Sequence, residues 1–196
     1  RKKGTANLRK HLQNVSLYHV PYVVAINHFG SDSQEEIEAL VSILKAKNIP
    51  YALNSSYLEG PTGAKDLAKK VLEVLEEEKS EYTPLVKKNR SIKEKIETIS
   101  KNIYGAKNVE YSETAEKEIK DYEKQGYQDF SVCISKVPTS LSDDATLLNV
   151  PKDTTLHVKN TRLFTGARFI VPLTGKVFTR PGLPLHPAAE DRKEIK

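Results

Sequence analysis

The feature that most constrains the fold of this chain is the alternation between strand-length apolar runs and amphipathic helical segments. Residues 21–26 (PYVVAI) are continuously apolar, which is typical of a parallel strand buried on both faces. Ser33 and Glu36 have the spacing of a capping box at the start of a helix that ends before Pro50. A second strand is expected at residues 51–53, and a second helix follows the GPTG turn at 60–63. This β-α-β-α order predicts an α/β domain.

The second half of the chain changes character. Ser91 with Glu94 again predicts a helix start, and that helix should stop near Gly105. Residues 112–125 predict a further helix, which Gly126 would end. Beyond Phe130, short extended pieces are expected at 131–134, 155–158, 169–173 and 176–179. We therefore predict an α/β region over residues 1–80 and a C-terminal, helical then strand-rich α+β portion over residues 81–196.

Composition narrows the function classes. The chain has 196 residues, a net charge of +5 and a single cysteine, Cys133. Its basic residues are interleaved with acidic ones, which disfavours a nucleic-acid binder, and no apolar run approaches the roughly 18 residues of a membrane span. The five histidines form no H-x-x-x-H pair, so no metal site is expected. We expect a cytoplasmic protein without a membrane partner, whose first residues, Arg1-Lys2-Lys3, lie inside a longer polypeptide.

Several segments together resemble formate–tetrahydrofolate ligases, in that family's order. They are residues 6–11 (ANLRKH), 25–29 (AINHF), 91–99 (SIKEKIETI), 103–106 (IYGA), 140–144 (SLSDD), 169–175 (FIVPLTG) and 181–184 (PGLP). The resemblance covers nearly the whole chain. It implies the C-terminal part of an enzyme that uses ATP, with Mg²⁺, to convert formate and tetrahydrofolate to 10-formyltetrahydrofolate through formyl phosphate.

The resemblance also implies which portion of the enzyme this is. Family members begin with a nucleotide-binding domain that carries a P-loop, whereas no G-x-x-x-x-G-K-[ST] occurs in this sequence. Residues 1–80 would then belong to the end of a P-loop-NTPase-like domain, and residues 81–196 would complete the folate and nucleotide cleft. We expect no catalytic residue here, no activity in isolation, and a homo-oligomer. The alternative is a degenerate, non-catalytic scaffold that acts through protein contacts.

The first candidate site follows the first strand. Asn27 and Phe29 lie just beyond it, where open α/β sheets commonly bind ligands, so we expect contact with adenine or folate. The alternative is that Asn27 caps the loop and Phe29 packs in the core. Tyr57 lies near the position at which members of the family have the Trp of a W-A-x-G-G motif. Its ring would stack on a planar ligand.

The second candidate site lies in the C-terminal portion. Lys136, Ser140, Ser142 and Asp143 occupy a segment that reads A-K-T-Q-x-S-L-S-D in the family, and the resemblance implies nucleotide or folate contacts there. This sequence departs from the pattern at Val137 and Pro138, which replace Thr and Gln. It departs again at Arg168, where the family has glycine.

A third candidate is the turn formed by Pro181, Gly182, Leu183 and Pro184, which would line the adenine pocket or serve only as a turn between strands. Arg180 before it replaces a methionine of the family pattern, and Leu185 after it replaces a lysine.

Overall fold

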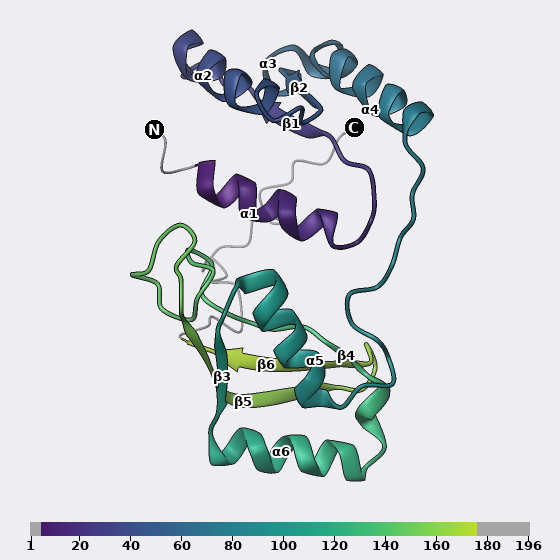
Figure 1. Cartoon of the computed structure of the whole chain (residues 1–196), viewed down its shortest axis with the longest axis vertical. Coiled ribbons are helices and arrows are strands. Elements are labelled where there is room, and N and C mark those ends of the chain that lie inside the picture. The colour runs from purple at the N-terminus through teal and green to yellow at the C-terminus, as the bar shows by residue number, and fades with distance from the viewer. Residues whose placement is uncertain (1–4, 176–196) are drawn as a thin grey trace, which may run out of the picture. The chain divides into compact units, whose positions relative to one another are not determined.

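The structure is a computed structural model that describes residues 5–175, and these fold into two compact units (Figure 1). Residues 7–85 form the N-terminal unit. Residues 86–175 form the C-terminal unit. The predicted strand at 176–179 and the candidate residues Arg180 to Pro184 lie outside the described residues.

The N-terminal unit has the predicted β-α-β-α order. Its elements are α1 (Thr5–Ser16), β1 (Val24–Asn27), α2 (Gln34–Lys45), β2 (Tyr51–Asn54), α3 (Ser56–Glu59), η1 (Gly60–Ala64) and α4 (Lys65–Glu77). Strands β1 and β2 are parallel and pair from Val24 with Tyr51 to Asn27 with Asn54. Ser33 caps α2, as predicted, because its hydroxyl oxygen accepts a hydrogen bond from the Glu36 backbone N–H at 3.3 Å.

The prediction that β1 is buried on both faces is wrong for the described residues. Only Ile26 of β1 is buried, whereas Ala25 and Asn27 are exposed. The reason is that a parallel strand is buried on both faces only where helices cover both, and in the described residues the main helix contact of this pair is that of α4 with β2.

The C-terminal unit begins with the predicted capping box. The Ser91 hydroxyl accepts from the Glu94 N–H at 3.2 Å, and the Glu94 carboxylate accepts from the Ser91 N–H at 2.8 Å. Helix α5 (Ile92–Ile99) continues as the π-helical turn η2 (Ser100–Tyr104). Gly105 ends it in the left-handed conformation, with φ 75°. The remaining helices are α6 (Glu113–Lys124), which Gly126 follows at φ 83°, and the short η3 (Tyr127–Asp129).

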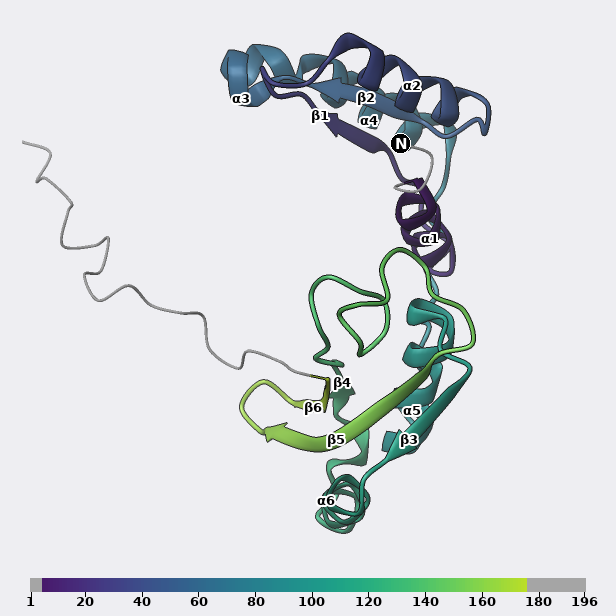
Figure 2. The same cartoon turned by 90° about the vertical axis from the view of Figure 1, so that its left-hand side faces the viewer.

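A mixed four-stranded sheet of order β3-β5-β6-β4 organises this unit (Figure 2). Its strands are β3 (Asn108–Tyr111), β4 (Ser131–Val132), β5 (Thr155–Phe164) and β6 (Phe169–Thr174). Strands β5 and β6 pair antiparallel, and each has a parallel outer neighbour. The sequence did not predict β3, and it placed the end of β5 at residue 158, where a register shift follows. Both differences arise because strand pairing, not local pattern, sets these bounds.

The core of the C-terminal unit joins both helices to one face of the sheet. It contains Ile92, Ile96, Ala115, Ile119, Leu156, Val158 and Ile170, all at most 1% exposed. Along β5 the opposite face carries His157, Lys159 and Arg162, which are exposed. One covered face and one open face are ordinary for a sheet with an antiparallel pair.

Lys95 is an unexpected member of this interior. It is 1% exposed, and its ammonium donates hydrogen bonds to the carbonyl oxygens of Gln128 at 2.6 Å and Phe130 at 3.0 Å. Burial lowers the pKa of Lys95, and Asp129 partly opposes that shift. The lysine therefore ties α5 to the segment that leads into β4.

The lowered pKa makes stability depend on pH. Between the folded and the higher unfolded pKa of Lys95, the unfolded chain binds more protons, so the free energy of unfolding rises with pH in that window. Below the folded pKa the cost of burying the cation is fully present. We expect the free energy of unfolding of the wild type, minus that of Lys95→Met, to increase with pH across this window in urea titrations, up to the ordinary lysine pKa of about 10.5. A flat difference would contradict this assignment.

Candidate functional site

Two asparagines meet at the carboxyl end of the parallel pair. Asn27 ends β1 and Asn54 ends β2, and the Asn54 side-chain amide donates to the Asn27 side-chain oxygen at 3.0 Å. The Asn54 side-chain oxygen accepts from the Ser56 N–H at 3.3 Å, which orients the amide. The structure thus brings Asn27 to the sheet edge where α/β folds bind ligands. Asn54 was missed from the sequence, although it follows the second strand as Asn27 follows the first.

Aromatic side chains come shortly after these two asparagines in the chain, Phe29 after Asn27 and Tyr57 after Asn54. The rings of Phe29 and Tyr57 lie 5.4 Å apart at an interplanar angle of 57°, so the structure brings two predicted site residues together. Phe29 is 44% exposed and Tyr57 is 79% exposed, which contradicts the alternative that Phe29 is core packing. Next to them, His28 Nδ1 lies 3.2 Å from the Ser55 hydroxyl. We call Asn27, His28, Phe29, Asn54 and Tyr57 the carboxyl-end shelf.

Backbone contacts hold the second loop of the shelf in place. The Ser55 N–H donates to the Gly63 carbonyl at 3.0 Å, and this brings η1 against the end of β2. A Cβ at Gly63 would lie 2.5 Å from the Ser55 carbonyl carbon, closer than real atoms approach. Gly63 is therefore required by close approach, and this loop determines where Tyr57 lies.

Gly63→Ala is expected to lower the free energy of unfolding of the N-terminal unit by about 1–3 kcal/mol, because backbone must move to admit the methyl group. Urea titration followed by circular dichroism measures this loss. Gly30→Ala is the matched control, since the nearest atom to its added Cβ is a flexible leucine carbon at 3.9 Å. Equal effects of the two substitutions would contradict the role given to Gly63.

The predicted residues of the C-terminal unit gather in one loop, and the polar atoms of Lys136, Ser140 and Ser142 form hydrogen bonds within that loop. The Lys136 ammonium donates to the backbone carbonyls of Val137 and Ser140, and burial lowers the pKa of Lys136. Ser140 and Ser142 are 5% and 2% exposed. Their hydroxyls donate to the carbonyls of Leu147 and Asp144. These contacts build the loop, and the assignment of its side chains to a ligand stays a prediction.

Asp143 connects this loop to the sheet. Its carboxylate accepts from the His157 N–H at 2.9 Å and lies 2.8 Å from His157 Nδ1. His157 Nε2 lies 3.6 Å from the Glu110 carboxylate, so one imidazole lies between two acids. A cavity of about 480 Å³ beside them is also lined by Lys159 and Gly175. No spacing in the sequence marks His157 as the neighbour of Asp143.

The departures from the family pattern have definite places. Val137 is buried and Pro138 is exposed in the loop. Arg168 lies in the turn between β5 and β6 at φ 56°, a conformation that glycine adopts without strain. Its guanidinium lies 5.2 Å from the centre of the Phe130 ring. The glycine expected at this position therefore suits a tight turn.

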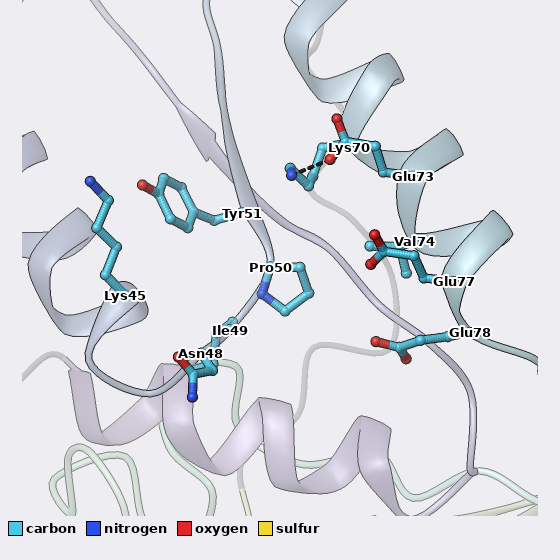
Figure 3. Close-up of a pocket in the computed structure, with 10 residues that line it drawn as sticks. All are labelled: Lys45, Asn48, Ile49, Pro50, Tyr51, Lys70, Glu73, Val74, Glu77 and Glu78. Atoms are coloured by element: carbon cyan, nitrogen blue, oxygen red, sulfur yellow. Dashed lines mark hydrogen bonds and ion pairs between the residues drawn. The ribbon is translucent and has the colours of Figure 1, made fainter.

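A separate hollow of about 540 Å³ opens at the amino end of β2 (Figure 3). Its lining carries two cations, Lys45 and Lys70, and three acids, which are Glu73 and Glu77 of α4 and Glu78 just after it. The Lys70 ammonium pairs with Glu73. Because ligands of open α/β sheets bind at the carboxyl ends of strands, the shelf is the better candidate.

Metal-binding clusters and membrane spans are both missing from the described part of the chain. Residues 5–175 contain no group of three or more His, Cys, Asp or Glu side chains placed to hold a metal ion. No helix in that range is both long and apolar enough to cross a membrane.

The fold and the shelf define an α/β protein that presents amide and aromatic side chains at the carboxyl ends of parallel strands, the arrangement of ligand-binding α/β domains. The family model for formate–tetrahydrofolate ligase matches residues 1–195, and the chain belongs to that family. The formate–tetrahydrofolate ligase of Pediococcus pentosaceus is 40% identical over 189 residues, and that of Bacillus licheniformis is 39% identical over 188. Each alignment covers 96% of this chain and 34% of the relative, so the chain spans about a third of their length.

Proposed function

We propose that this chain is the C-terminal part of an ATP-dependent ligase that forms 10-formyltetrahydrofolate from formate and tetrahydrofolate. The family match over residues 1–195 supports this assignment. In the proposed reaction, formate attacks the γ-phosphorus of ATP, giving formyl phosphate and ADP. The folate amine then attacks the formyl carbon, and phosphate leaves.

We assign the phosphate chemistry to polypeptide outside this chain. Phosphoryl transfer requires backbone N–H groups, a lysine and Mg²⁺ around the phosphates, and the sequence carries no P-loop to supply them. In this proposal residues 1–80 end a P-loop-NTPase-like domain and residues 81–196 complete the cleft. The complete enzyme is a cytoplasmic homo-oligomer.

The carboxyl-end shelf is the part of this chain that we assign to substrate. The observation that carries the assignment is the exposed pair of rings, Phe29 and Tyr57, which lie 5.4 Å apart and come shortly after the hydrogen-bonded Asn27 and Asn54 in the chain. Aromatic faces attract planar heterocycles, and amide groups can hydrogen-bond to their edges. We propose that the shelf holds such a ring, supplied either by the pterin of tetrahydrofolate or by the adenine of ATP.

The remaining predicted contacts belong to the same proposal. Lys136, Ser140, Ser142 and Asp143 of the C-terminal unit would contact the nucleotide or the folate, although their polar atoms already have partners within the chain. The turn at Pro181–Pro184 would line the adenine pocket. The assignments of this loop and of this turn to ligand contact have weaker support than the assignment of the shelf.

Product formation tests the proposal directly. The chain alone, given formate, tetrahydrofolate and MgATP, is expected to give no 10-formyltetrahydrofolate. A chimera in which the chain replaces the matching part of the Pediococcus pentosaceus ligase is expected to turn over. Isothermal calorimetry then measures the affinity of the chimera for MgATP and, separately, for tetrahydrofolate, with Phe29 and with Phe29→Ala. The ligand whose affinity Phe29→Ala lowers is the one whose ring the shelf binds.

A second candidate function is a ligase-derived scaffold without catalysis. The observation that favours it is that Lys136, Ser140 and Ser142 form their hydrogen bonds within their own loop. A folded chimera that binds neither MgATP nor tetrahydrofolate would support the scaffold and reject the enzyme.

A further inference from the structure

The loop of residues 136–143 is fixed to strand β6 where it begins. Ser135, just before the loop, donates its N–H to the Pro172 carbonyl at 2.9 Å, and its own carbonyl accepts from the Thr174 N–H at 2.9 Å. The Thr174 hydroxyl donates to that same carbonyl at 3.1 Å, and Thr174 is fully buried. The chain therefore leaves the sheet for this loop at a fixed point.

Close backbone approach fixes the loop where it ends. Gly175 follows β6 at φ 66°, and a Cβ at this position would lie 2.5 Å from the Asp143 carbonyl oxygen. Any side chain there would have to move the loop backbone. Between the two ends of the loop, Val137 and Leu141 are buried. The loop is thus a packed unit, and its position depends on where Asp143 is held.

The imidazole of His157 holds the Asp143 carboxylate from β5. Its Nδ1 lies 2.8 Å from Asp143 Oδ2, and the His157 backbone N–H donates to the same oxygen at 2.9 Å. Because an ionised carboxylate only accepts hydrogen bonds, Nδ1 is the donor. The Asp143 side chain is 13% exposed, so water competes little for this contact. His157 Nε2 lies 3.6 Å from the Glu110 carboxylate, which is beyond the reach of a hydrogen bond.

Asp143 also borders the cavity of about 480 Å³ described above. Of the four predicted contact residues in this loop, Asp143 is the one that lines this cavity. Both hydrogen bonds from His157 end on Oδ2, so the other carboxylate oxygen, Oδ1, can accept from a ligand. His157 therefore orients the carboxylate that the loop presents at the cavity.

We propose that His157 is a positioning residue of the ligase, which holds Asp143 Oδ2 and so fixes both the loop of residues 136–143 and the direction of Asp143 Oδ1. The ligand group that Oδ1 receives is an N–H or O–H donor, since a carboxylate oxygen only accepts. This inference rests on the proposed function, which assigns Asp143 and its loop to contact with the nucleotide or the folate. His157 acts through Asp143 and not on the reacting atoms.

Steady-state kinetics of the Pediococcus pentosaceus chimera test the proposal. His157→Ala removes the Nδ1 donor and is expected to raise KM for MgATP or for tetrahydrofolate ~5-fold or more, with kcat within about 2-fold of wild type. His157→Asn should bring KM back close to wild type, because the amide nitrogen of the new side chain can donate from nearly the position of Nδ1. Glu110→Gln is the matched control. It alters the other acid beside the imidazole and should leave both KM values unchanged.

A double-mutant cycle measures whether His157 acts through Asp143. Asp143→Ala should raise the same KM as His157→Ala, and the double variant should raise it no further than Asp143→Ala alone. Effects that multiply in the double variant overturn the proposal. A fall in kcat with both KM values unchanged in His157→Ala also overturns it.

Amide hydrogen exchange on the chain alone separates this proposal from the proposed function. The buried Ser142 N–H donates to the Ser140 hydroxyl at 3.0 Å, and the N–H of residue 157 donates to Asp143. In His157→Ala the protection factors of these two amides are expected to fall ~5-fold or more, and in His157→Asn they should stay near wild type. Unchanged protection in His157→Ala overturns the positioning role. Lost protection, together with a wild-type chimera that does not turn over, supports positioning and rejects only the proposed function.

Discussion

Phe29→Ala in the catalytically complete chimera is expected to lower kcat/KM for the substrate whose ring the shelf holds by about 5- to 150-fold. This range corresponds to the roughly 1–3 kcal/mol that stacking of a planar base on an aromatic side chain contributes. Tyr57→Ala should have an effect of similar size, because both rings border the same position. If the ring is pterin, KM for tetrahydrofolate rises and KM for MgATP stays; if it is adenine, the reverse holds.

The control for this experiment is Leu58→Ala, which removes a neighbouring side chain that is 49% exposed. It should leave both KM values near wild type. The double variant Asn27→Ala, Phe29→Ala should lower kcat/KM further than Phe29→Ala alone, since the Asn27 amide would hydrogen-bond to the edge of the ligand ring. Unchanged kinetics in Phe29→Ala and in Tyr57→Ala would reject the shelf as a substrate site.

Lys95→Ala is expected to lower the free energy of unfolding of the C-terminal unit by about 2–4 kcal/mol. The substitution removes the buried methylenes of a fully enclosed side chain and leaves the carbonyls of Gln128 and Phe130 without this donor. Relief of the desolvation cost of the ammonium offsets part of that loss. Urea titration measures the total, and amide exchange within α5 assigns it to this unit.

Lys101→Ala is the control for the buried lysine. Its ammonium forms an ion pair with Glu97 at 2.9 Å at the surface, and exposed pairs contribute about 0–1 kcal/mol. A loss for Lys95→Ala no larger than that of Lys101→Ala would mean that the buried hydrogen bonds do not stabilise the fold. Lys95→Met should lie between them, because it retains most of the apolar volume.

Much of the fold could be predicted from local pattern. The Ser91–Glu94 capping box, the start of α2 after Ser33 and the glycine stop at Gly126 all follow from hydrogen bonding within a few residues. The parallel direction of β1 and β2 follows from the helix between them. Strand β3 was missed because its four residues carry little pattern, and its parallel pairing with β5 comes from far along the chain.

The candidate site was predictable only in part. Asn27 and Phe29 follow a visible strand, so their place at its carboxyl end could be inferred. The contact between the Phe29 and Tyr57 rings depends on how Gly63 packs against the backbone of Ser55. A contact between backbones has no side-chain pattern in the sequence, so the glycine is its one visible sign. In the same way, the pairing of Asp143 with His157 depends on a loop folding back on β5.

The sequence by itself determined the order of helices and strands, their caps and the family, because each depends on short-range spacing or on matching segments. Only the tertiary structure decided that Lys95 lies inside, that Asn54 meets Asn27, and that His157 meets Asp143. These outcomes depend on which surfaces pack together, and packing joins residues whose separation along the chain carries no periodic signal.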